Sequence, residues 1–187
     1  MGFVNAHFIA YATGFGASTI AAAGSLATVG VMSIAGALIF GYFSDKRGVR
    51  PVLAIAYGFR GLGYGVLLMA DSLPMATLGV MIIGISWTSA ISLTGAISAD
   101  QFGLRRLGTV YGSIFAIMPL GAASGVWIAG RVFDNTGSYD LALQISMALG
   151  LGAALLIGLP RYRQLAPELP EFPGTPPAKP DEASATE

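Results

Sequence analysis

The chain has 187 residues, of which 54% are hydrophobic and only 11% are charged. A soluble domain carries about 25% charged residues, so the composition indicates a membrane-embedded protein. Ten basic residues balance ten acidic ones, which leaves no basic excess for nucleic-acid binding. With no Cys and a single His, disulfides, Cys-ligated zinc and thiol nucleophiles are excluded, and we expect no metal site and no cofactor.

Apolar stretches predict the secondary structure. About 20 apolar residues at a rise of 1.5 Å cross a hydrocarbon core of about 30 Å, so each long stretch predicts a membrane-spanning helix. The stretch 2–14 would reach only about 20 Å as a helix and predicts either a re-entrant segment or part of a longer span. The complete predicted spans are residues 18–43, 51–70, 75–99, 107–133 and 139–159.

The C-terminal segment has a different composition. Seven of the ten prolines lie at or beyond Pro160, with acidic and small residues between them. Such a segment buries too little apolar surface to fold. We therefore divide the chain into an all-α helical bundle in the membrane, residues 1–160, and a disordered Pro-rich tail, residues 161–187.

Basic residues predict the orientation in the membrane. Because the five predicted spans are antiparallel, seven basic residues fall on one face of the membrane, and only Arg131 falls on the other. Loops rich in Lys and Arg stay in the cytoplasm, so this face and the tail are predicted to be cytoplasmic, in the plasma (inner) membrane. The seven residues are Lys46, Arg47, Arg50, Arg105, Arg106, Arg161 and Arg163.

A charged segment, residues 41–50, separates the first two complete spans. It resembles the loop motif Gly-x-x-x-Asp-basic-x-Gly-basic-basic of the major facilitator superfamily, although Val49 departs from the usual basic residue. Glycine allows two helices to approach each other closely, and it also adopts positive φ without strain. Aspartate can cap a helix or pair with arginine. The resemblance implies that such contacts hold one closed state of a transporter; the alternative is an ordinary charged loop. The matching residues are Gly41, Asp45, Lys46, Gly48 and Arg50.

Three further segments look like the monocarboxylate and oxalate–formate antiporter branch of that family. Residues 7–16 resemble the end of the seventh helix, residues 100–108 the loop entering the eleventh, and residues 130–139 its exit. The resemblance covers about residues 3–160 and implies the second six-helix half of a twelve-helix transporter. The expected partners are then the lipid bilayer, a small solute, and either an absent N-terminal half or a second copy.

Two groups of polar side chains inside the apolar segments are candidate sites. Arg60 is the only charge deep inside a span, and Tyr57 and Tyr64 share its helix face. An intramembrane Arg is by default a functional-site hypothesis, but the resemblance implies a peripheral helix here, where a structural pair or a snorkelling side chain is the alternative. His7 and Tyr11 lie four residues apart in a helix that lines the cavity in the resembled family; His7 is either a proton-transfer group or a packing residue.

A row of small and polar residues follows one face of the predicted span 75–99. Gly84, Thr88, Ser92 and Gly95 recur at steps of three and four residues. In lipid such a row usually forms a close helix–helix seam, and lining of a solute pathway is the alternative. Trp87 lies in the middle of the span, so it either packs against a neighbour or lines a cavity.

The functional expectation is secondary active transport of a small organic solute by alternating access, with carboxylates as one candidate class. The first complete span has no charge, whereas the resemblance would give a proton-coupled monocarboxylate carrier an ionic pair there, which argues against lactate-type chemistry. The alternative is a transport-inactive half-size membrane protein that acts as an oligomerising or regulatory partner. An enzyme is not expected, because the spans hold no Cys, no acid pair and no His cluster.

Overall fold

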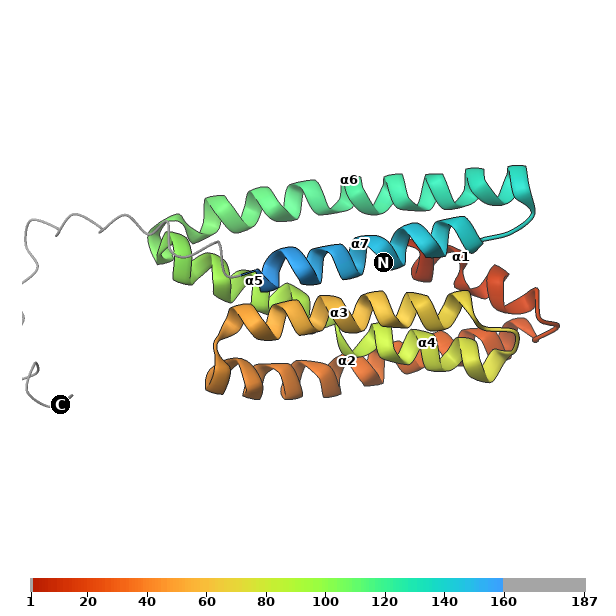
Figure 1. The fold of residues 1–187 in the computed structure, drawn as a ribbon, viewed down its shortest axis with the longest axis horizontal. Helices are drawn as coiled ribbons and strands as arrows, with labels where there is room; N and C mark the ends of the chain where they lie inside the picture. The colour runs from red at the N-terminus through yellow and green to blue at the C-terminus, as the bar shows by residue number, and fades with distance from the viewer. Residues whose placement is uncertain (1, 160–187) are drawn as a thin grey trace, which may run out of the picture.

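The computed structural model describes residues 2–159, and these residues form seven α-helices without a strand. Figure 1 shows them as an elongated bundle. Five segments are long and apolar enough to cross a membrane, α4 and α5 counting as one, which confirms the predicted spans. The predicted tail, residues 161–187, lies outside the described residues. The helices are α1 (Gly2–Thr13), α2 (Thr19–Arg47), α3 (Val49–Leu68), α4 (Leu73–Ile85), α5 (Trp87–Phe102), α6 (Leu104–Thr136) and α7 (Asp140–Gly158).

Short connections join the helices, and glycine makes three of them possible. Gly48, Gly103 and Gly137 have φ of 84°, 74° and 69°, a conformation that other residues adopt only with strain. The sequence suggested that the charged segment 41–50 is a loop. The structure differs, because Gly48 alone separates α2 from α3. Its residues up to position 47 continue α2, since nothing before Gly48 interrupts the backbone hydrogen bonds of the helix.

The predicted single helix 75–99 is interrupted for one residue, at Ser86. The Ser86 N–H bonds back three residues to the Ile83 carbonyl (3.1 Å), as in a 3₁₀ turn. The Arg60 Nη2 donates to the Ser86 carbonyl oxygen (3.1 Å). Figure 1 shows the chain changing direction between α4 and α5. The interruption coincides with this contact from α3, which the periodicity of a single helix does not reveal.

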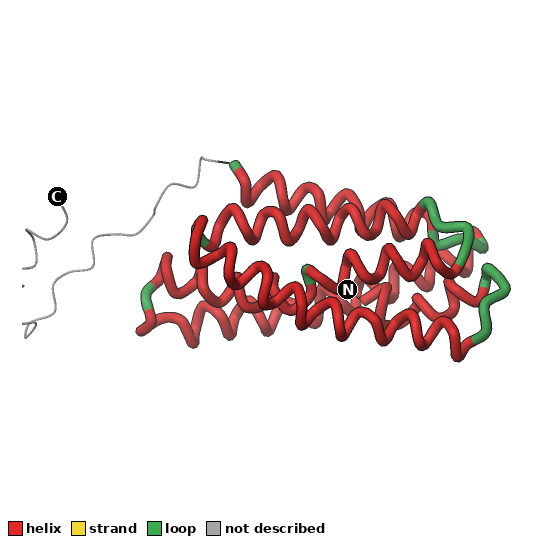
Figure 2. Tube along the Cα trace, turned by 90° about the horizontal axis from the view of Figure 1, so that it is seen from below, coloured by secondary structure: helices red, strands yellow, loops and turns green. Residues whose placement is uncertain are grey.

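Helix α3 forms the centre of the bundle and packs against both α4 and α7. Its crossing with α7 depends on two glycines: a Cβ added to Gly150 would lie 2.8 Å from the Gly61 Cα. Side chains there would hold the two backbones apart, so close helix approach in the membrane requires small residues. Figures 1 and 2 show α3 and α7 lying side by side.

Helix α6 is the least embedded of the long helices. Among its 33 residues only Ala129 is buried, and its contacts are mainly with α1 and α5. It runs unbroken through Pro119, although a proline inside a helix removes one backbone hydrogen bond. Four of its glycines would carry a Cβ without meeting any atom within 4 Å: Gly108, Gly112, Gly121 and Gly125.

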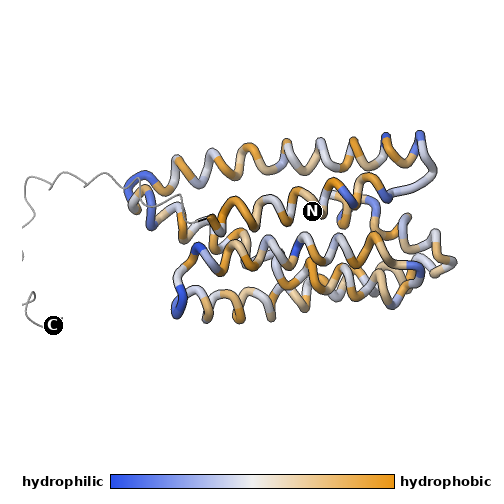
Figure 3. The backbone as a smooth tube through the Cα atoms, in the orientation of Figure 1, coloured by the Kyte–Doolittle hydropathy of each residue, from blue (hydrophilic) through white to orange (hydrophobic). Residues whose placement is uncertain are grey.

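The polar residues of the bundle are concentrated at its two ends. In Figure 3 the strongest hydrophilic segments lie at the end that holds the α2–α3 and α5–α6 turns. Arg50 at the start of α3 also contacts the C-terminus of α7, which therefore reaches the same end. The basic clusters around Arg47 and Arg105 thus share one end, as the two crossings between them, an even number, predicted.

Candidate functional site

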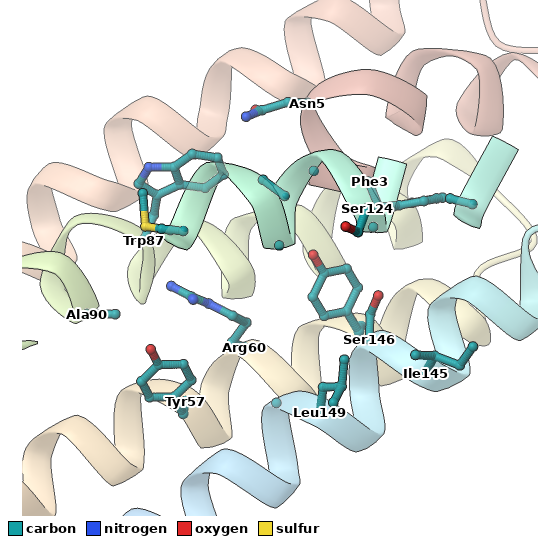
Figure 4. Close-up of a pocket in the computed structure, with 18 of the residues that line it drawn as sticks. Phe3, Asn5, Tyr57, Arg60, Trp87, Ala90, Ser124, Ile145, Ser146 and Leu149 are labelled. Carbon is teal, nitrogen blue, oxygen red and sulfur yellow. The ribbon is translucent and has the colours of Figure 1, made fainter. Parts of the chain in front are cut away.

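A cavity of about 720 Å³ lies between α1, α3, α5, α6 and α7. Ligand sites typically have volumes of about 300–1,000 Å³ and a mostly apolar wall with a few polar groups. This cavity has that character, because apolar side chains from α6 and α7 form much of its wall (Figure 4). The polar residues in its lining are Asn5, Tyr57, Arg60, Tyr64, Trp87, Thr94, Ser124 and Ser146.

Arg60 is the one charged residue in this lining, which contains no Asp or Glu. Figure 4 shows its side chain extending from α3 between Tyr57 and Trp87. The guanidinium carbon lies 5.1 Å from the centre of the Tyr57 ring, and Nη2 donates to the Ser86 carbonyl. Nε is buried and has no hydrogen-bond acceptor within residues 2–159. A guanidinium has five N–H donors, so Arg60 retains unused hydrogen-bonding capacity.

Tyr64 follows Arg60 by one helical turn and lines the same cavity. Its side chain is only 2% exposed, and its hydroxyl group is buried without a partner among the described residues. An unsatisfied buried polar group costs about 1–3 kcal/mol. Arg60 and Tyr64 therefore place two incompletely bonded donors on one face of α3, as their spacing in the sequence predicted.

Trp87 lines the cavity at the start of α5, whereas Thr88 and Ser92 lie outside the lining. The predicted row of small residues is divided by the interruption at Ser86. Gly84 packs against α2, where an added Cβ would lie 3.0 Å from the Val29 Cα. Gly95 faces Tyr111 of α6 instead. The row therefore contributes close packing in two directions, and α5 presents Thr94 to the cavity in place of Thr88 and Ser92.

His7 and Tyr11 also lie outside the cavity lining. The His7 Nε2 lies 3.1 Å from the Val126 carbonyl oxygen, and Nδ1 lies 3.3 Å from the Tyr139 hydroxyl. The Tyr11 hydroxyl donates to the Leu67 carbonyl. Both side chains thus connect α1 to neighbouring helices. Phe3 and Asn5 are the α1 residues that reach the cavity.

Sequence reasoning missed four polar lining residues: Asn5, Thr94, Ser124 and Ser146. Asn5 is an amide within an apolar segment, and this signal could have marked it. Thr94, Ser124 and Ser146 had no comparable signal, because the serine and threonine hydroxyls of a buried helix commonly bond to the carbonyl four residues earlier. All three do so here.

The residues of the charged segment lie away from the cavity, at the end of the bundle. Arg50 donates from Nε to the Ile157 carbonyl (2.9 Å) and from Nη2 to the Leu159 carbonyl (2.7 Å). A cation at these carbonyls complements the partial negative charge of the α7 C-terminus. Lys46 lies over the Tyr42 ring, 4.4 Å from its centre. Asp45 is exposed on α2, and Gly41 has open space around it.

Comparison with known proteins agrees with this architecture. The family model described as "Major Facilitator Superfamily" matches residues 1–184. Monocarboxylate transporter 12 of Homo sapiens is 26% identical over 159 residues, which cover 83% of this chain and 31% of that protein. The uncharacterized MFS-type transporter YcxA of Bacillus subtilis is 28% identical over 168 residues, covering 83% of this chain and 39% of its own length.

A triacylglyceride transporter of Mycobacteroides abscessus is 30% identical over 124 residues, covering 66% of this chain and 24% of that protein. The chain spans about a third of the length of the curated relatives it matches. These relatives are named as transporters, and the family match extends over nearly the whole chain. The chain is an integral, multi-pass membrane protein that belongs to the major facilitator superfamily, a family of transporters and not of enzymes.

Proposed function

We propose that the protein takes part in secondary active transport of a small organic solute by alternating access. The observation that carries this proposal is the cavity between five helices, with a mostly apolar wall and a few convergent polar groups. Membership in a transporter family supports it. Transporter sites commonly lie near interrupted helices, and the interruption at Ser86 adjoins this cavity through Arg60. Arg60 and Trp87 are the sequence-derived candidates that line it.

A partner half is part of the proposal, because the chain spans about a third of the length of its curated relatives. Helices α2 and α6 offer surfaces for such a partner. Several glycines on each helix have no atom of the described residues within 4 Å of an added Cβ, among them Gly24 and Gly30 on α2 and Gly108 and Gly112 on α6. Small residues are typical of helix–helix seams in lipid. The partner would be a further six-helix half or a second copy of the chain.

The charged segment has a proposed role in switching between conformations. Arg50 holds the start of α3 to the end of α7, so these two helices would move together. Asp45 and Lys46 are exposed at the same end of the bundle, where a partner half could pair with them. Gly41 would let that half approach α2 closely. The positive φ of Gly48 keeps α2 and α3 joined by a minimal turn.

The transport proposal is tested by solute uptake into proteoliposomes. The purified chain would be reconstituted alone and together with any six-span half encoded next to its gene, and challenged with labelled solutes that include carboxylates. We expect saturable uptake with both halves and none with the chain alone, because a half-transporter lacks part of the pathway wall. Saturable uptake by the chain alone would assign the partner role to a second copy. Absence of uptake in every combination would contradict the proposal.

The second candidate is a transport-inactive partner that binds another membrane protein. The surface of α6 at Gly108 and Gly112 favours it, since no atom of the described residues covers these two glycines. Substituting Gly108 and Gly112 by Leu separates the two functions, because these residues lie outside the cavity lining. A pure binding partner would lose association in co-purification without having any uptake to lose, whereas a transporter half would lose association and uptake together.

The proposed orientation places the basic end of the bundle in the cytoplasm of a cell whose plasma membrane holds the protein. The chain has no native Cys, so single-cysteine variants report topology directly. Ser44→Cys and Gln101→Cys should be protected from an impermeant thiol reagent in intact cells, and Asn135→Cys should be labelled. The opposite labelling pattern would invert the orientation, and labelling of Ser44→Cys without Gln101→Cys would contradict the bundle topology.

A further inference from the structure

We infer that the cavity binds an organic monoanion with an apolar tail, whose charged head is held by Arg60 and Tyr64. This inference deepens the proposed function, because it rests on the same cavity and names the class of solute. The first argument is charge: the lining has one cation and no acid, so a single negative charge neutralises it. An unpaired Arg inside a membrane span is costly and is normally paired.

The second argument is the state of the hydrogen-bond donors. The Arg60 Nη2 donates to the Ser86 carbonyl, and its Nε is buried without an acceptor among the described residues. The Tyr64 hydroxyl is also buried, and no residue from 2 to 159 bonds to it. Guanidinium groups bind carboxylates through paired N–H donors, and such charge-assisted bonds are about twice as strong as neutral ones. A carboxylate acceptor arriving from the cavity would satisfy donors that the described residues leave unused.

The third argument is the shape and polarity of the remaining wall. The rest of the wall is formed largely by α6 and α7 and is mostly aliphatic, with Ile114, Met118, Ile128, Ile145 and Leu149 among its residues. A cavity of about 720 Å³ is much larger than a carboxylate group needs and falls within the range of drug-sized ligands. The solute class is therefore a carboxylate with an alkyl tail of several carbons rather than a two- or three-carbon acid.

Trp87 provides the reporter for a binding experiment. The chain has two tryptophans, and Trp127 is 67% exposed on α6, outside the cavity lining. Trp127→Phe leaves Trp87 as the only indole in the molecule. The full chain in phosphatidylcholine nanodiscs would be titrated with octanoate, with acetate and with 1-octanol, and Trp87 fluorescence would be followed. Binding is measured without transport, so a failure of uptake with intact binding would count against the transport proposal alone.

We expect saturable binding of octanoate, weaker binding of acetate and weaker binding of octanol. Burial of each methylene group strengthens binding by up to about fourfold, the fold-change that corresponds to about 0.8 kcal/mol. Arg60→Gln should weaken octanoate binding by about ten- to a hundredfold, as the loss of a charge-assisted hydrogen bond does. The matched control is Arg131→Gln, which removes an exposed arginine outside the cavity lining and should leave the affinity unchanged.

Arg60→Gln also removes the hydrogen bond to Ser86, so it can change the fold as well as binding. Tyr64→Phe is the second variant that tests binding without that effect. The Tyr64 hydroxyl has no hydrogen-bond partner in the described part of the chain, so its removal should weaken octanoate binding several-fold without lowering the melting temperature. Equal affinity for octanol and octanoate would overturn the anion assignment, and acetate binding as tightly as octanoate would overturn the apolar tail. Full octanoate affinity in both the Arg60 and Tyr64 variants would overturn the whole inference.

Discussion

The crossing of α3 and α7 gives a sharp test of the packing. In Gly150→Ala the new methyl group would lie 2.8 Å from both the Cα and the N of Gly61. Carbon atoms pack at about 3.5–4.0 Å, so the two backbones must separate by roughly 0.7 Å or more. The contacting atoms belong to backbone and cannot rotate away. Overpacking of this kind costs about 1–3 kcal/mol.

Gly152→Ala on the same helix is the matched control, because a Cβ there meets no atom within 4 Å. It should be neutral or stabilising by up to about 1 kcal/mol, since Ala is the better helix former. Thermal unfolding of the two purified variants in one detergent, followed by loss of the monodisperse species, measures the difference. At about 2–4 °C per kcal/mol, Gly150→Ala should melt several degrees lower. Equal melting temperatures for the two variants would refute the close crossing.

Three further substitutions test other contacts. Arg50→Gln should speed hydrogen exchange in the last turn of α7, because two carbonyls there lose a charged donor; unchanged exchange would contradict the cap. His7→Phe keeps an aromatic ring but removes the bonds to Val126 and Tyr139, and a melting temperature lower by a few degrees is expected; an unchanged value would show that these bonds contribute little. Gly36→Ala should destabilise the bundle by more than about 1 kcal/mol in the same assay, since its methyl group would overlap the α4 backbone; wild-type stability would disprove that approach.

The sequence alone was sufficient for the class of fold and for the family. The number of membrane spans follows from the length of each apolar stretch, because a buried backbone in lipid must form helices. The turn at Gly48 was predictable, since the residue that permits positive φ stood within a recognisable motif. The proposed pairing of Arg60 with Tyr57 and Tyr64 on one face also followed from helical spacing, and all three line the cavity.

Which faces meet, and therefore which residues line the cavity, was decided only by the tertiary structure. The interruption at Ser86 redirects α5, so Thr94 rather than Thr88 or Ser92 reaches the cavity. The His7 side chain forms hydrogen bonds with Val126 and Tyr139 between helices and does not face the cavity. Helical periodicity fixes the neighbours of a residue along its own helix, but the choice between a packed seam and a solute cavity depends on the volume of the side chains on the facing helices.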